Sequence, residues 1–172
     1  MNSNRLGRTA NPIPRRKYPA LTTFEEVAFA HCTRRIEEWR LKTASARDEN
    51  KKRFAAAWSS GPFGWLGANI ITFERPTFVY ILGGPSLLKV GVTQDLSKRF
   101  RALRVECPEE MHVLALADGT KDDEARLHAA LMDEHSHREW FRRTPKMGAV
   151  IDAINKTMTV PDSATLTDLL RL

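Results

Sequence analysis

The stretch FVYILGGPSLLKVGVTQDLSKRF, residues 78–100, decides the fold of this chain. Two β-rich apolar runs, TFVYIL and LLKVGVT, flank the turn sequence GGPS, and this pattern predicts an antiparallel hairpin. Thr93 or Asp95 is then placed to cap a basic helix that begins at LSKRF. The opening stretch therefore predicts a hairpin that leads directly into a helix.

Further elements follow the hairpin. MHVLALAD predicts a third strand, and DDEARLHAALMDEHS predicts a helix whose first turn is acidic, as the helix dipole favours. PKMGAVIDAINKTM predicts another helix with Pro145 near its first turn, and SATLTDLLRL predicts a last short helix. The expected fold class is α+β: a small antiparallel or mixed three-stranded sheet flanked by helices, with an N-terminal helical extension.

The N-terminal extension begins with a capping-box pattern, Thr22 or Thr23 followed three residues later by Glu25 or Glu26. The helical period weakens near Ser45–Asp48, so one long helix and two broken helices both remain open. We expect four segments along the chain: a basic, disordered arm (1–20), a helical extension (21–68), the main α+β core (69–157) and a short C-terminal helix (158–172).

The charge of the chain is concentrated in the arm. The formal net charge is +6, and residues 1–20 carry five basic side chains and no acidic one. Such an arm gains affinity for phosphates by releasing counterions, although a merely solubilising terminus has the same composition. The expected nucleic-acid contacts are Arg15, Arg16 and Lys17 of the arm, with Lys98 and Arg101 of the basic helix.

Other features of the sequence exclude several classes of protein. A composition of 42% hydrophobic and 28% charged residues is typical of a globular protein, and no apolar run approaches a membrane span. Cys32 and Cys107 lack the spacing of a zinc site; they form either one disulfide or, as expected in a reducing compartment, two free thiols. We expect a cytoplasmic protein that does not engage a membrane.

Five polar residues are candidates for one site. In the hairpin, Tyr80 and Lys89 are expected on the face opposite that of Val79 and Ile81. Singly, a strand tyrosine is usually a packing residue, and a strand lysine usually protects a sheet edge from aggregation. The remaining candidates lie on helices: Arg99 one turn into the basic helix, and Glu124 and His128 four residues apart on the acidic one.

Taken in order, these motifs resemble those of the GIY-YIG nuclease superfamily. They are most similar to the variant branch typified by phage T5 open-reading-frame-172 proteins and fungal Mug113-type domains. The resemblance covers about residues 77–145. It rests on the motifs VYIL, KVGVT, Arg99, EARLH and EWF, in that order.

The resemblance implies a metal-dependent phosphodiesterase. Tyr80 takes the place of a tyrosine that lies against the attacking water, and Arg99 would stabilise charge on the scissile phosphate. Glu124 would be the sole protein carboxylate on a Mg²⁺ or Mn²⁺ ion. Lys89 replaces the second-motif tyrosine and would serve either as a base, if its pKa is lowered, or as a phosphate contact. Independently of the resemblance, the imidazole of His128 is a candidate to accept or relay a proton near neutral pH.

Two functions are compatible with these residues. The first is an endonuclease, of phage or bacterial origin, that hydrolyses phosphodiester bonds, with DNA as the expected substrate. The second is a catalytically weak or inactive module on the same fold, which binds nucleic acid or docks onto a larger protein assembly. The N-terminal helices, including Trp39 and Trp58, would then provide the protein-docking surface.

Overall fold

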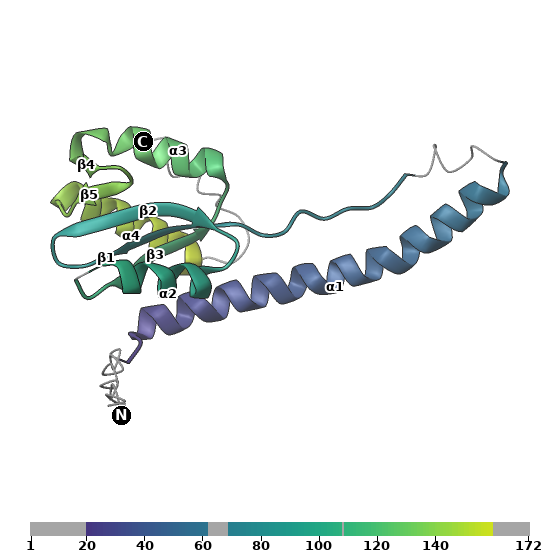
Figure 1. Ribbon diagram of the computed structural model, residues 1–172, viewed down its shortest axis with the longest axis horizontal. Coiled ribbons are helices and arrows are strands. Elements are labelled where there is room, and N and C mark those ends of the chain that lie inside the picture. The colour runs from purple at the N-terminus through teal and green to yellow at the C-terminus, as the bar shows by residue number, and fades with distance from the viewer. Residues whose placement is uncertain (1–19, 62–68, 108, 160–172) are drawn as a thin grey trace, which may run out of the picture.

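The computed structural model describes residues 20–61, 69–107 and 109–159. A long helix, α1 (Thr23–Ser59), precedes an α+β core formed by the hairpin and the elements after it (Figure 1). The core consists of β1 (Phe78–Gly83), β2 (Leu87–Thr93), α2 (Leu96–Glu106), β3 (His112–Asp118), α3 (Lys121–Ala130), β4 (His135–His137), β5 (Trp140–Arg142) and α4 (Pro145–Thr159).

The sheet has five antiparallel strands in the order β3-β1-β2-β5-β4. The expected hairpin is confirmed, and its register places Tyr80 opposite Gly91. The expectation of three strands was wrong, because β5 pairs with Leu87–Lys89 of β2 and β4 pairs with β5. Each added strand has only three residues, too few to show an alternating pattern in the sequence. Similarly, the helix expected over residues 122–136 ends at Ala130.

Helices cover both faces of the sheet, so all six residues of β1 are buried. On one face, Val79 and Ile81 pack against α3 and α4. On the other face, Phe78 and Tyr80 pack against α2 and the first part of α1. The expected division of the hairpin side chains between two faces is therefore confirmed, and neither of these faces is open to solvent along β1.

Helix α1 is a single unbroken helix of 37 residues, so the alternative of a break near Ser45–Asp48 is wrong. The expected capping box is present at its start. The Thr22 side chain accepts the Glu25 amide at 3.2 Å, and the Glu25 carboxylate accepts the Thr22 amide at 2.7 Å. Glu25 is 2% exposed and also accepts the Val113 amide of β3 at 3.0 Å. The cap of the helix therefore also attaches it to an edge strand of the sheet.

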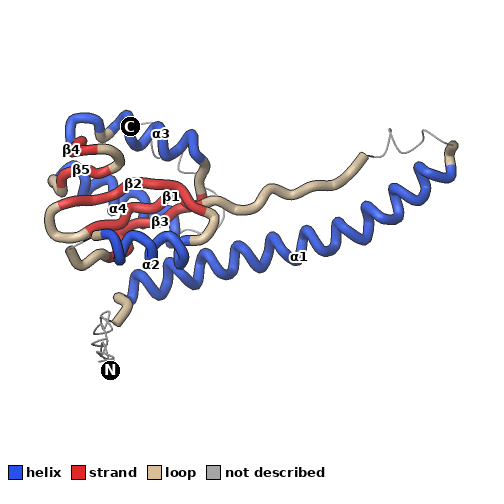
Figure 2. The backbone as a smooth tube through the Cα atoms, viewed as in Figure 1, coloured by secondary structure: helices blue, strands red, loops and turns tan. Residues whose placement is uncertain are grey.

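The second half of α1 projects away from the core, and residues 69–77 run back beside it without regular structure (Figures 1 and 2). The Asn50 side chain holds this segment by pairing with both backbone groups of Ile71, at 2.7 and 2.8 Å. The Trp39 indole donates to the Phe73 carbonyl at 3.0 Å. The returning segment is thus fastened to the helix by backbone contacts.

Several other expectations concern single residues or the chain ends. Both cysteines are free; Cys32 is buried, which raises its thiol pKa to about 12, and Cys107 is half-buried. None of the described helices is long and apolar enough to cross a membrane. The arm, except for Ala20, and the helix expected over SATLTDLLRL lie outside the described residues.

Candidate functional site

Tyr80 and Arg99 form the centre of the candidate site. Asp95 caps α2 by accepting the Lys98 amide at 2.9 Å, which fixes the first turn of the helix that carries Arg99. The Arg99 Nε then donates to the Tyr80 hydroxyl oxygen at 2.8 Å. Tyr80 is only 1% exposed, and this burial raises the pKa of its hydroxyl although the hydrogen bond from Arg99 opposes the shift. The tyrosine is therefore neutral at pH 7 and bound to a charged guanidinium.

Gly91 makes room for the tyrosine ring. It is the cross-strand partner of Tyr80, and a Cβ atom there would overlap the ring and its hydroxyl group. A side chain of any size at this position would push the ring away from Arg99. The glycine of KVGVT is thus required by close packing, as expected where something approaches the backbone.

Lys89 lies on β2, one strand away from Glu139. Its Nζ donates to Glu139 Oε2 at 2.5 Å and lies 5.5 Å from the centroid of the Trp140 ring. Since β2 lies between β1 and β5, Lys89 does not protect a sheet edge as isolated strand lysines usually do. The hydrogen bond from Lys89 lowers the pKa of Glu139, and the charges of Arg99 and His128 lower it further.

Helix α3 carries the other two candidates and contacts β2. Thr120 and Asp123 form a capping box at its start, so Glu124 lies in the first turn, half-buried. Its carboxylate is close enough to contribute to the raised pKa of Tyr80. The His128 ring packs edge-on against the Phe141 ring, with the two ring centroids 5.0 Å apart. The buried Nε2 of His128 has no hydrogen-bond partner among the described residues.

Three of the five candidates are hydrogen-bonded in two pairs, one of which includes Glu139, and the other two candidates lie on α3. The bonded pairs are Tyr80–Arg99 and Lys89–Glu139, and Glu124 and His128 interact electrostatically with them. Lys98 and Arg101 are exposed on α2, whereas Arg15, Arg16 and Lys17 lie outside the described residues. Glu139 is the residue that sequence reasoning left without a role. The sequence feature that could have identified Glu139 is its position in the motif EWF, next to Trp140 and the buried Phe141.

The HSH sequence, residues 135–137, directly follows the short 3₁₀ helix Met132–Glu134, and its Ser136 and His137 are exposed. His135 and His137 form β4, where they pack on Phe141 and Trp140 with ring centroids 5.7 and 6.4 Å apart. Their neighbours are aromatic because β4 pairs with the strand that carries WFR. These histidines therefore take part in packing at this end of the sheet.

The site has limited means to hold a metal ion. In the described ranges, no three His, Cys, Asp or Glu side chains converge as a metal-binding group. Mg²⁺ commonly uses one or two carboxylates and completes its shell with water and substrate phosphate oxygens. Glu124 fits that pattern, because its side chain is half-buried and its charge acts on Tyr80, whose pKa it helps to raise. The residues present are compatible with a single-carboxylate metal site.

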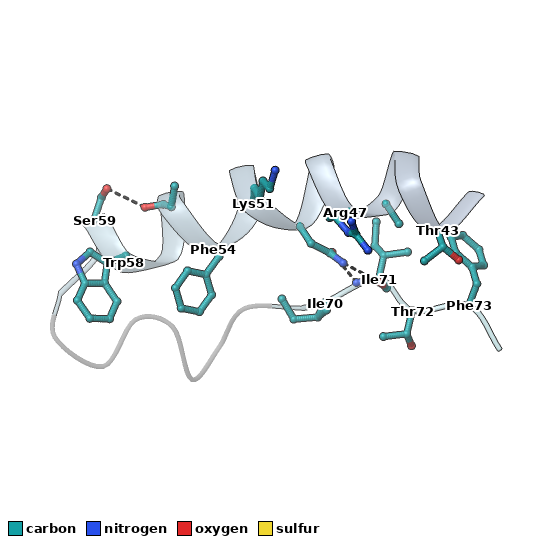
Figure 3. A pocket seen from close by; sticks show the side chains of 13 residues that line it. Thr43, Arg47, Lys51, Phe54, Trp58, Ser59, Ile70, Ile71, Thr72 and Phe73 are labelled. Atoms are coloured by element: carbon teal, nitrogen blue, oxygen red, sulfur yellow. Dashed lines mark hydrogen bonds between the residues drawn. The ribbon is translucent and has the colours of Figure 1, made fainter. Parts of the chain in front are cut away.

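A separate groove of about 900 Å³ lies far from this site, between the second half of α1 and the returning segment (Figure 3). Its apolar wall includes Phe54 and Trp58, which stack with centroids 6.2 Å apart. Trp58 is 60% exposed, an unusual exposure for a side chain of its size. Arg47 and Lys51 are also among the lining residues, and the Lys51 Nζ lies 3.6 Å from Asp48 Oδ1.

The part of the chain that matches a known family lies within the core. No curated protein matches this chain, and no solved structure does. Residues 77–158, which carry both bonded pairs together with Glu124 and His128, match the family model of the T5orf172 domain, a family associated with nuclease-type domains.

Proposed function

We propose that this protein is a metal-dependent endonuclease, of phage or bacterial origin, that hydrolyses DNA phosphodiester bonds. The observation that carries the proposal is the hydrogen bond between Tyr80 and Arg99, with Glu124 in electrostatic contact, inside the segment that matches the T5orf172 domain. Both thiols are free, which suits a reducing compartment, and we place the protein in the cytoplasm.

Arg99 is proposed as the phosphate contact. Its Nε is occupied by the Tyr80 hydroxyl, and the terminal nitrogens make no hydrogen bond to another described residue. A guanidinium held in this way presents a planar pair of donors, which matches two phosphate oxygens. These donors would stabilise the charge that develops on phosphorus-bound oxygens when water attacks and the bond to the leaving oxygen breaks. Tyr80 thereby orients Arg99 and keeps it in place.

Glu124 is proposed as the protein ligand of Mg²⁺ or Mn²⁺. A bound divalent ion would supply charge stabilisation and a more acidic water molecule. His128 is proposed to accept or relay a proton, and its buried Nε2, which has no partner among the described residues, supports this role. Lys98 and Arg101, exposed on α2, together with Arg15, Arg16 and Lys17, are proposed to hold the DNA backbone through charge.

Substitution of Glu124 tests the enzymatic function. Glu124→Ala should reduce Mg²⁺-dependent nicking of supercoiled plasmid by at least about a hundredfold, because the metal loses its protein carboxylate. Asp122→Ala is the matched control, since Asp122 is an exposed acid in the same first turn of α3. Circular dichroism would verify that both variants are folded. Equal activity of wild type and Glu124→Ala, or none from wild type with either metal, would refute the proposal.

One observation favours the second function, a docking module. The groove along α1 is apolar, yet Arg47 and Lys51 line it. This combination suits a segment of another protein that carries apolar side chains flanked by acidic ones. Since the groove is carried by the projecting half of α1, such a partner could bind without covering Tyr80 or Arg99.

A further inference from the structure

The turn between β4 and β5 has an unusual backbone. It consists of Arg138 and Glu139, and Arg138 has φ +53°. Two-residue hairpin turns with this conformation at their first position favour glycine, because other side chains are strained there. The Arg138 carbonyl accepts from His135 Nε2 at 2.7 Å, which helps to fix the turn. A strained residue held in place by its surroundings often marks a functional position.

The strained turn presents Glu139 to Lys89. The lysine side chain is 9% exposed, whereas the glutamate side chain is 50% exposed. An almost buried ammonium in an inner strand requires a partner, and Glu139 supplies it at 2.5 Å. Trp140 covers the same ammonium, with its ring centroid 5.5 Å away. Lys89 is therefore a hydrogen-bond donor held from two sides.

The pair is also coupled to the candidate phosphate contact. The hydrogen bond to Tyr80 raises the pKa of Arg99, and the Glu139 carboxylate contributes in the same direction. Glu139 consequently interacts with both cations of the site, one by direct contact and one through space. The strand register agrees with this coupling: Gly91 lies opposite Tyr80, and Lys89, two residues before Gly91 on β2, shares its face of the sheet.

We propose that Glu139 is a positioning residue, which fixes the Lys89 ammonium on the face of the sheet that carries Tyr80 and its partner Arg99, as a second cationic contact for the phosphodiester. This inference rests on the proposed function and deepens it, because it assigns Lys89 the part of a phosphate contact and not of a base. Glu139 restrains the lysine and offsets its charge. Its removal should therefore strengthen attraction to DNA while weakening the alignment of the reacting phosphate.

Binding without metal tests the restraint separately from catalysis. The probe is a short fluorescein-labelled DNA duplex, titrated in EDTA at several salt concentrations and followed by anisotropy. Glu139→Gln should lower the Kd for the duplex about 3- to 10-fold. The slope of log K against log salt concentration should become steeper by up to the equivalent of about one phosphate contact. This gain should be much smaller in a Lys89→Met background, where only the through-space effect of Glu139 on Arg99 remains. Glu134→Gln, the same change on a nearby half-buried glutamate, should leave binding unaltered.

The rate of catalysis should change in the opposite direction to the affinity for DNA. In steady-state nicking with Mg²⁺, Glu139→Gln should lower kcat about tenfold or more even though its DNA affinity rises, because alignment is lost. A purely structural loss would lower affinity and kcat together. Thermal unfolding of Glu139→Gln would show that the variant remains folded.

The outcomes separate this inference from the proposed function. A gain in affinity that is undiminished in the Lys89→Met background would overturn it, because Glu139 would then act without Lys89. Unchanged or weaker binding by Glu139→Gln would overturn it as well. If wild type binds DNA but never cleaves it, the endonuclease proposal fails, and the binding cycle in EDTA still decides the role of Glu139. Failure of wild type to bind DNA would overturn both.

Discussion

The two halves of α1 belong to one helix but are used in opposite ways. The first half is fastened to β3 by polar side chains: Glu25 binds the Val113 amide, and His31 and Arg35 bind Asp118 at 2.9 and 2.7 Å. The second half projects from the core and lines an apolar groove with Phe54 and Trp58 exposed (Figures 1 and 3).

The difference shows that polarity does not indicate which part of this helix is anchored. Buried or paired charges are specific, because each requires its own partner, so they fix the position of the first half against the sheet. Exposed aromatic side chains contribute little to folding and are available to a ligand. The first half should therefore be sensitive to loss of single polar groups, and the second half should tolerate loss of large apolar ones.

Replacement of Glu25 should have the largest effect. Glu25→Ala leaves the backbone amides of Thr22 and Val113 without their carboxylate acceptor, although the Thr22 side chain still caps the amide of residue 25, so the unfolding free energy should fall by about 3 kcal/mol. Urea denaturation measures this loss. Glu26→Ala is the control, because Glu26 is exposed in the same first turn. This substitution should lower the unfolding free energy by only about a few tenths of a kcal/mol. Equal effects of the two substitutions would contradict an anchoring role for the cap.

Replacement of Asp118 should have a smaller, pH-dependent effect. Burial tends to raise the pKa of Asp118, but the hydrogen bond from His31 and the charge of Arg35 lower it overall. A lowered folded-state pKa gives stability that is present above the ordinary aspartate value, about 4, and is lost as pH falls through the folded-state pKa. Since the side chain is 42% exposed, Asp118→Asn should cost about 1 kcal/mol at pH 7.

The same substitution should cost progressively less below pH 4, where the wild-type carboxylate becomes protonated. Urea denaturation at pH 7, 5 and 3 would follow this convergence of the two proteins. Asp152→Asn, a change at an exposed position of α4, should leave the pH dependence of wild type unaltered. A constant difference between wild type and Asp118→Asn at all three pH values would show that the charge of Asp118 does not fasten the helix.

Local sequence patterns were sufficient for most of the fold. Alternation and the GGPS turn identified the hairpin, and the spacing of Thr22 and Glu25 identified the cap of α1. The patterns failed for β4 and β5, whose three residues each depend on pairing with β2 and not on local preference. They also could not show that Glu25 reaches β3, a contact across 88 positions of the sequence.

The sequence predicted which residues belong to the site better than it predicted which of them are hydrogen-bonded to one another. Tyr80 and Arg99 were placed together through the motif order, and they are hydrogen-bonded. Nothing local connects Lys89 to Glu139, because their contact requires β5 to return beside β2 and Arg138 to adopt a left-handed backbone. The candidate roles of the five site residues stay predictions until substitution tests them.

Replacement of Trp58 should have the smallest effect on folding and the largest on the groove. Trp58→Ala should change unfolding free energy by less than about 0.5 kcal/mol, because the side chain is 60% exposed. The anionic apolar dye 1-anilinonaphthalene-8-sulfonate resembles the proposed partner in chemistry, so it should fluoresce on folded wild type and lose affinity in Trp58→Ala and Arg47→Glu. Val105→Ala, which removes an apolar side chain 70% exposed on α2, should leave dye binding unchanged. Equal dye binding in all four proteins would mean that the groove does not bind apolar anions. A large loss of stability in Trp58→Ala would mean that the second half of α1 is anchored as firmly as the first.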